Sequence, residues 1–191
     1  RIVNLLTTSR LYIDQISHDL NRLCGKNTGI PIYVEKLKSR EYDSVFGYRV
    51  MEALRNYVQH RGLPIHLLTY KVEKVDAQNG TEFKHKVSPL IRVEDLEMDG
   101  KFKKTVLDEL RQANGKVDLK VLIREYIQSI LNVHCFIRDL LLEDVKKWEK
   151  TVNYAYEEYE KQYEKSAMIT IIELDNNGFK KEMIHILYDI L

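Results

Sequence analysis

Apolar residues in the first third of the chain recur at the spacing of amphipathic helices. Over residues 8–23 they repeat every three or four positions, and Gly25 then supplies a stop of the kind that ends helices. Residues 28–31 are interpreted as a connection, after which a second repeat covers residues 45–60 and is ended by Gly62 and the proline after it. The pattern therefore predicts two long helices, the second ending near residue 60.

Between residues 65 and 93 the apolar pattern changes from helical spacing to alternation. β-branched and aromatic residues alternate with polar ones on both sides of residues 76–80, which contain the Asn79-Gly80 pair favoured in hairpin turns. Both predicted strands carry lysines among their polar positions. We therefore predict a β-hairpin inserted after the second long helix, as an exposed flap rather than a core sheet.

The second half of the chain returns to helical spacing. A short helix is predicted from about residue 100 to the stop at Asn114-Gly115, and Asp118 is a suitable cap for the next helix. The apolar face then continues to about residue 165, which predicts one long helix over about 118–165. A strand-like run at 166–174, a turn and a last amphipathic segment close the chain.

These elements predict a mainly α fold, a bundle of four or five helices with a hairpin insertion at about 65–93. The 191 residues match the usual size of one domain, and we expect a single domain over 1–191. Apolar residues make up 44% and charged residues 31%, which is typical of a folded protein and too apolar for a disordered one.

Charge and cysteine content narrow the classes of partner. Thirty Lys and Arg against twenty-nine Asp and Glu give a formal net charge of +1, so any polyanion has to be held by a local cluster. Cys24 and Cys135 have no CxxC spacing, which indicates neither a disulfide scaffold nor a thiolate zinc site and favours a reducing, cytoplasmic location. No secretory leader and no apolar stretch of about 20 residues is found, so we expect no membrane partner.

The candidate chemistry lies at the end of the second predicted helix, in Arg55, Asn56 and His60. A permanently charged guanidinium and an imidazole that titrates near neutral pH suit phosphate-ester chemistry. At ~100° per residue, Asn56 and His60 lie about 40° apart, whereas Arg55 lies about 140° from His60. Arg55 and His60 therefore reach one phosphate only if the helix loosens near Gly62 or a second subunit approaches.

Neighbouring residues are expected to support this group. Glu52, one turn before Asn56, can orient it by hydrogen bonding, and Arg61 adds a cation, with Gln59 as a further supporting residue. The remaining histidines lack the paired spacing of a helical metal site, and no phosphate-binding loop or HExxH motif is present. We therefore expect no metal ion and no cofactor.

The segment Leu54-Arg55-Asn56-Tyr57-Val58-Gln59-His60 resembles the signature of the HEPN superfamily (higher eukaryotes and prokaryotes nucleotide-binding). In that signature an Arg is followed by four to six residues and then a His, commonly with a polar residue directly after the Arg. The position of the motif at the end of a long helix followed by further helices also resembles the HEPN bundle. The resemblance covers the motif and, loosely, residues 1–165.

The resemblance implies a metal-independent endoribonuclease of a toxin–antitoxin, CRISPR-associated or phage-defence system, acting on RNA at a composite site across a homodimer. An antitoxin protein would be a further partner. His60 would transfer protons as the ribose 2′-hydroxyl attacks phosphorus, and Arg55 would stabilise the developing charge. Asn56 would bind the phosphate or hold His60.

Two other interpretations remain open. The same fold can bind RNA or a nucleotide, or recruit a partner, without catalysis. The helix around residues 148–163 can pair with another chain, which leaves Arg55 and His60 as charges that complement a helix end. The tyrosines at 154–163 and the lysines at 101–104 are interpreted as a packing seam and a solvated face.

Overall fold

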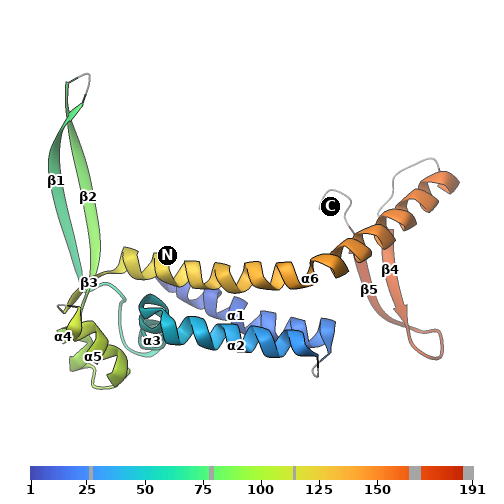
Figure 1. The fold of residues 1–191 in the computed structure, drawn as a ribbon, viewed down its shortest axis with the longest axis horizontal. Coiled ribbons are helices and arrows are strands. Elements are labelled where there is room, and N and C mark those ends of the chain that lie inside the picture. The colour runs from blue at the N-terminus through green and yellow to red at the C-terminus, as the bar shows by residue number, and fades with distance from the viewer. Residues whose placement is uncertain (26–27, 78–79, 114, 164–168, 187–191) are drawn as a thin grey trace. The chain divides into compact units, whose positions relative to one another are not determined.

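The computed structural model describes residues 1–25, 28–77, 80–113, 115–163 and 169–186, which are mainly helical and include two small antiparallel sheets (Figure 1). The chain divides into two compact units, residues 1–137 and 138–191, and the division falls inside the last helix. The mainly α prediction is confirmed. The expectation of one domain stays a prediction.

The first unit begins with three helices, α1 (Ile2–Cys24), α2 (Gly29–Ser44) and α3 (Phe46–His60). The predicted ends near Gly25 and His60 are confirmed. The predicted connection at 28–31 is wrong, because α2 begins there with Pro31 in its first turn, where the missing N–H costs little. The motif helix is therefore the third helix of the chain and not the second.

Helix α3 supplies the centre of the core. Val50, Met51 and Leu54 have no exposed surface, and burying a side chain of this kind contributes roughly 1.5–3 kcal/mol. They pack in a cluster with Tyr48 of the same helix and with residues of α1, of the hairpin base, of the short helices after the hairpin and of the last helix: Leu6, Ile91, Leu96, Val106, Leu110, Leu119, Leu122 and Tyr126. This cluster fixes the orientation of the motif helix.

The last helix, α6 (Leu119–Tyr163), approaches α3 closely at Gly47. The Gly47 N–H donates to Glu125 Oε2 at 2.8 Å, and an added Cβ would lie 2.6 Å from the Glu125 Cβ. Asp118 caps α6 as predicted, since its Oδ1 accepts from the Lys120 N–H at 2.9 Å. Although α6 is long, no helix among the described residues is apolar enough over a sufficient length to cross a membrane.

The hairpin follows α3 as predicted. Strand β1 (Leu67–Ala77) pairs antiparallel with β2 (Gly80–Arg92), and residues 78–79 of the predicted turn lie outside the described residues. A short strand, β3 (Lys116–Asp118), adds to the base of β2. This third strand is too short for alternation to predict it.

Two short helices lie between the hairpin and β3. They are α4 (Val93–Met98) and α5 (Lys104–Gln112), where the sequence predicted a single helix from about residue 100. Gly100, with φ +67°, separates them and leaves Phe102 buried before α5 begins. The segment between α4 and α5 forms part of the site described below.

The second unit contains the C-terminal part of α6 and a hairpin of β4 (Ile169–Leu174) and β5 (Lys180–Ile186). The predicted turn between the strands is confirmed, with Gly178 at φ +81° and the Asp175 N–H donating to the Phe179 carbonyl at 2.8 Å. Residues 166–168 of the predicted strand lie outside the described residues.

Candidate functional site

A cleft of about 480 Å³ opens at the C-terminal end of α3. Asn56 and His60 line it from the last turn of the helix, and Arg61 follows directly. The other lining residues come from α2, from the body of α3 and from the segment between α4 and α5: Tyr42, Glu52, Ala53, Tyr57, Asp99, Lys101, Phe102 and Lys103. The structure thus brings together four of the predicted site residues, whereas Gln59 is exposed outside this lining.

The cleft carries more cationic than acidic groups. Its acidic residues are Glu52 and Asp99. Arg61 Nε lies 3.6 Å from Asp99 Oδ1, and Glu52 is paired with Arg10, so both carboxylates already have a cationic partner. Lys103 donates to the Tyr42 hydroxyl and its amino group lies 5.0 Å from the centre of that ring, while Lys101 is exposed. A local basic cluster therefore exists on a protein of nearly zero net charge. Sequence interpretation missed both lysines, which it took for a solvated face.

Arg55 does not line the cleft. Its side chain is half-buried, and its Nη1 donates to Asn56 Oδ1 at 2.9 Å. Its Nε is buried without a hydrogen-bond partner among the described residues. Because Asn56 accepts through Oδ1, its amide nitrogen stays available as a donor towards an anion in the cleft. The separation of Arg55 from His60 agrees with the angle of about 140° between their positions on a helix.

Glu52 holds the motif helix in place. Its Oε1 accepts from the Tyr126 hydroxyl at 2.9 Å and its Oε2 from Arg10 Nη1 at 3.2 Å, which ties α3 to α6 and α1. Burial raises the pKa of Tyr126, and the nearby Glu52 carboxylate raises it further. Among the described residues, the hydrogen bonds of Glu52 run to these groups and not to Arg55 or His60. Glu52 is therefore a positioning residue for α3.

The wall near Tyr57 connects the cleft to the hairpin. The Tyr57 ring contacts His66 edge to face, with centroids 6.1 Å apart. The Arg92 N–H donates to His66 Nδ1 at 3.2 Å, so this nitrogen carries no proton. Burial lowers the pKa of His66, although the Asp95 carboxylate acts in the opposite direction. His66 is thus held as a neutral imidazole at the hairpin base. Its role could not be predicted from the sequence, because His66 belongs to no recognisable motif.

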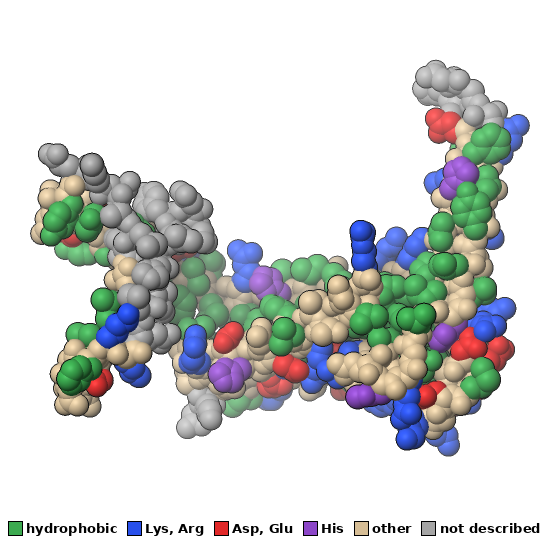
Figure 2. All heavy atoms as spheres, turned by 180° about the vertical axis from the view of Figure 1, so that it is seen from behind, with side chains coloured by type: hydrophobic (Ala, Val, Ile, Leu, Met, Phe, Trp, Pro, Cys, Tyr) green, Lys and Arg blue, Asp and Glu red, His purple; other side chains and the backbone are tan. Residues whose placement is uncertain are grey.

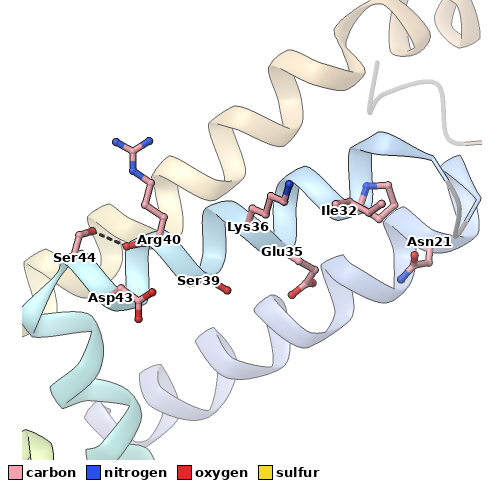
Figure 3. Close-up of a pocket in the computed structure, with 9 residues that line it drawn as sticks. Asn21, Ile32, Glu35, Lys36, Ser39, Arg40, Asp43 and Ser44 are labelled. Atoms are coloured by element: carbon pink, nitrogen blue, oxygen red, sulfur yellow. Dashed lines mark hydrogen bonds between the residues drawn. The ribbon is translucent and has the colours of Figure 1, made fainter.

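A second groove, of about 890 Å³, lies along α2. Lys36 and Arg40 extend from one side of the helix, whereas Glu35 and Asp43 extend from the other (Figure 3). Burial raises the pKa of Glu35, but hydrogen bonds from Ser17 and Lys38 outweigh burial and leave the pKa lowered. The two cations and two carboxylates that line the groove balance each other and extend in opposite directions. This groove is therefore a weaker candidate for an anion site than the cleft.

The cleft offers acid–base and anion-binding groups. His60 provides an imidazole, Asn56 an amide, and Arg61, Lys101 and Lys103 provide fixed cations. In the part of the chain that the structure describes, no three or more His, Cys, Asp or Glu side chains gather as they would to hold a metal ion.

Comparison of the chain with protein-family models, with curated proteins and with solved structures gives no match. The likeness of residues 54–60 to the HEPN signature therefore stays a resemblance.

Proposed function

We propose that the cleft binds the phosphate backbone of RNA and that the chain is an endoribonuclease of HEPN type. The observation that carries this proposal is the convergence of His60 and Asn56 with Arg61, Lys101 and Lys103 around one cleft. Phosphate groups are the anions that such a set of ammonium, guanidinium and amide donors binds best. The imidazole of His60 supplies a group that can accept and donate a proton.

The reaction requires only groups of the chain and of the RNA. His60 accepts the proton of the ribose 2′-hydroxyl while its oxygen forms a bond to phosphorus. The bond from phosphorus to the 5′-oxygen breaks, and that oxygen takes the proton from protonated His60, which returns to its neutral form. The products are a 2′,3′-cyclic phosphate and a 5′-hydroxyl. Lys101, Lys103 and Arg61 offset the charge that grows on the phosphate oxygens.

Arg55 enters this scheme through a second copy of the chain. It does not line the cleft of its own chain, and its charge is permanent. In a homodimer we expect Arg55 of one copy to stabilise the phosphate held beside His60 of the other. A toxin or phage-defence setting and an antitoxin partner follow from the resemblance and belong to the same proposal.

The second candidate function is RNA or nucleotide binding without cleavage. The hydrogen bond that ties Arg55 to Asn56, and the absence of Arg55 from the cleft lining, favour it. The cations of the cleft would then bind a phosphate group without cleaving the RNA.

Cleavage of labelled RNA in EDTA separates these functions. We expect the 191-residue chain to produce cyclic-phosphate ends and His60→Ala to produce none. His18→Ala is the matched control, because His18 is an exposed histidine on α1, and it should cleave as the wild type does. Binding without cleavage by the folded wild type would favour the second candidate.

Affinity for a single-stranded oligoribonucleotide tests the role of the lysines. Lys101→Ala should weaken binding and reduce the slope of log affinity against log salt by about 1. Arg22→Ala, at an exposed position on α1, should leave both unchanged. Equal losses in both variants, or no RNA binding by the folded wild type, would contradict a phosphate site in the cleft.

A further inference from the structure

The β1–β2 hairpin has one apolar face. Strand pairing places Tyr70 opposite Val87, Val72 opposite His85 and Lys74 opposite Phe83. Since side chains alternate between the two sides of a sheet, one side collects the residues that we define as the apolar face: Leu68, Tyr70, Val72, Phe83 and Val87. Two of these are aromatic and three are aliphatic.

The other side of the hairpin is charged. Lys71 lies opposite Lys86, and Glu73 lies opposite Lys84. Two lysines directly across from each other repel, and water screens this repulsion only if the side stays solvated. Among residues 68–74 of β1, Lys74 is the exception, since it lies on the side of the apolar face. A sheet with one mainly apolar side and one charged side is typically covered on one side only.

No described residue of the first unit covers the apolar face. The exposed fractions of Leu68, Tyr70 and Phe83 are 64%, 62% and 61%. Figure 2 shows hydrophobic side chains along the hairpin, with basic side chains at its edge. β3 pairs only with residues 90–92, so the rest of the hairpin has two strands. A two-stranded hairpin without a covered face is marginally stable in water.

We propose that the apolar face packs against the same face of a second copy of this chain. The proposal concerns the hairpin alone and does not depend on the proposed function. The five residues of the face carry no charge; Lys74 shares their side and lies at its end towards the turn, where its amino group stays in water. Of the neighbouring residues, His85 is held by the Tyr70 hydroxyl, and Lys74 lies beside Phe83. The sides bearing Lys71 and Lys86 then point away from each other into water.

The area of the face suits a dimer. If each of its five side chains loses roughly 100 Å², each copy buries roughly 500 Å² and the pair about 1,000 Å². That area is at the lower bound of a specific interface. The aromatic residues Tyr70 and Phe83 are of the types enriched in interface centres.

The chemistry of the face fits a protein better than a nucleic acid. Leu68, Val72 and Val87 have no ring on which a base can stack. Two of the nearby lysines, Lys71 and Lys86, lie on the opposite side, where they do not neutralise phosphates bound to the apolar face.

Two valines of β1 allow a matched test. Val72 lies on the apolar face and Val75 on the opposite side, and both are exposed. We expect light scattering of the complete chain at several concentrations to show a dimer for the wild type and for Val75→Lys. Val72→Lys should raise the dissociation constant at least about 100-fold, because each dimer then buries two new charges. Leu68→Ser, a smaller change on the same face, should weaken the dimer in the same direction.

Four outcomes would overturn the proposal. One is a monomeric wild type, and another is a dimer that neither Val72→Lys nor Leu68→Ser weakens while circular dichroism shows both folded. The third is a monomer whose binding of single-stranded RNA is lost in Tyr70→Ser, which would assign the face to nucleic acid. The fourth is a monomeric wild type in which Val72→Lys lowers the free energy of unfolding and Val75→Lys does not. That result would show that another segment of the same chain packs on the apolar face. RNA cleavage by the wild type and His60→Ala is measured separately. A monomeric wild type would also exclude the sharing of Arg55 between two copies, but it would not decide whether the cleft cleaves RNA.

Discussion

Replacing Tyr126 with Phe removes one hydroxyl from the contact that holds the motif helix. The Tyr126 ring has no exposed surface, and its hydroxyl donates to Glu52 Oε1 at 2.9 Å. Phe fills the same space, so packing is preserved and only the hydrogen bond is lost. The Glu52 carboxylate then keeps Arg10 as its remaining donor.

The expected loss of unfolding free energy follows from the kind of bond removed. Hydrogen bonds to charged groups contribute about 1.5–3 kcal/mol. The Glu52 side chain is only 15% exposed, so water replaces the lost donor incompletely. We therefore expect Tyr126→Phe to destabilise the chain by about 2 kcal/mol.

Tyr48→Phe is the matched control. The Tyr48 ring is also buried and lies 5.1 Å from the Tyr126 ring, but no hydrogen bond of its hydroxyl is found among the described residues. The same substitution there should change stability by less than about 0.5 kcal/mol. Urea unfolding should be followed by far-UV circular dichroism, because the single tryptophan, Trp148, lies in the second unit and does not report on this core.

Two results would refute this reasoning. Equal destabilisation by Tyr126→Phe and Tyr48→Phe would show that the loss comes from the ring environment rather than from the bond to Glu52. A loss below about 0.5 kcal/mol in Tyr126→Phe would show that Glu52 does not depend on this donor.

Two further substitutions test the packing and the hairpin base. Gly47→Ala should lower stability by about 3 kcal/mol and Tm by roughly 6–12 °C, because the new methyl would lie 2.6 Å from the Glu125 Cβ and 2.9 Å from the Leu122 carbonyl oxygen. An unchanged Tm would contradict this close approach. His66→Asn keeps an acceptor for the Arg92 N–H but does not titrate. The pKa of His66 is lowered in the folded state, so the wild type has its full stability above the ordinary value of 6.5 and loses stability as the pH falls below it. Urea unfolding at about pH 7.5 and about pH 5.5 should show that the free energy of unfolding falls less between the two pH values in His66→Asn than in the wild type. An equal fall in both proteins would contradict a neutral imidazole at His66.

The sequence predicted those helices and strands whose ends or turns are marked by residues close by in the chain. The end of α3 at His60 follows from the glycine and proline just beyond it, and the hairpin follows from alternation around its turn. Helical geometry alone also predicted that Asn56 and His60 share a face while Arg55 turns away. These features depend on residues close together in the chain.

Features that depend on distant residues were not predicted. Helix α2 buries only Pro31 and Val34, so its apolar periodicity is weak. The partners of Glu52 lie 74 and 42 positions away, and Lys101 and Lys103 reach the cleft only because α5, which follows them, packs against α3. A run of lysines has the same sequence pattern on a solvated surface as in an anion site.

The most direct test of a shared RNA site is to mix two inactive variants and measure cyclic-phosphate formation. Arg55→Ala and His60→Ala should each be inactive alone. After subunit exchange, half of the dimers in an equal mixture contain both variants and one of their two sites is intact, so about one quarter of wild-type activity should return. No cleavage by the folded wild type, full activity of either variant alone, or a mixture as inactive as its parts would contradict a site shared between two copies.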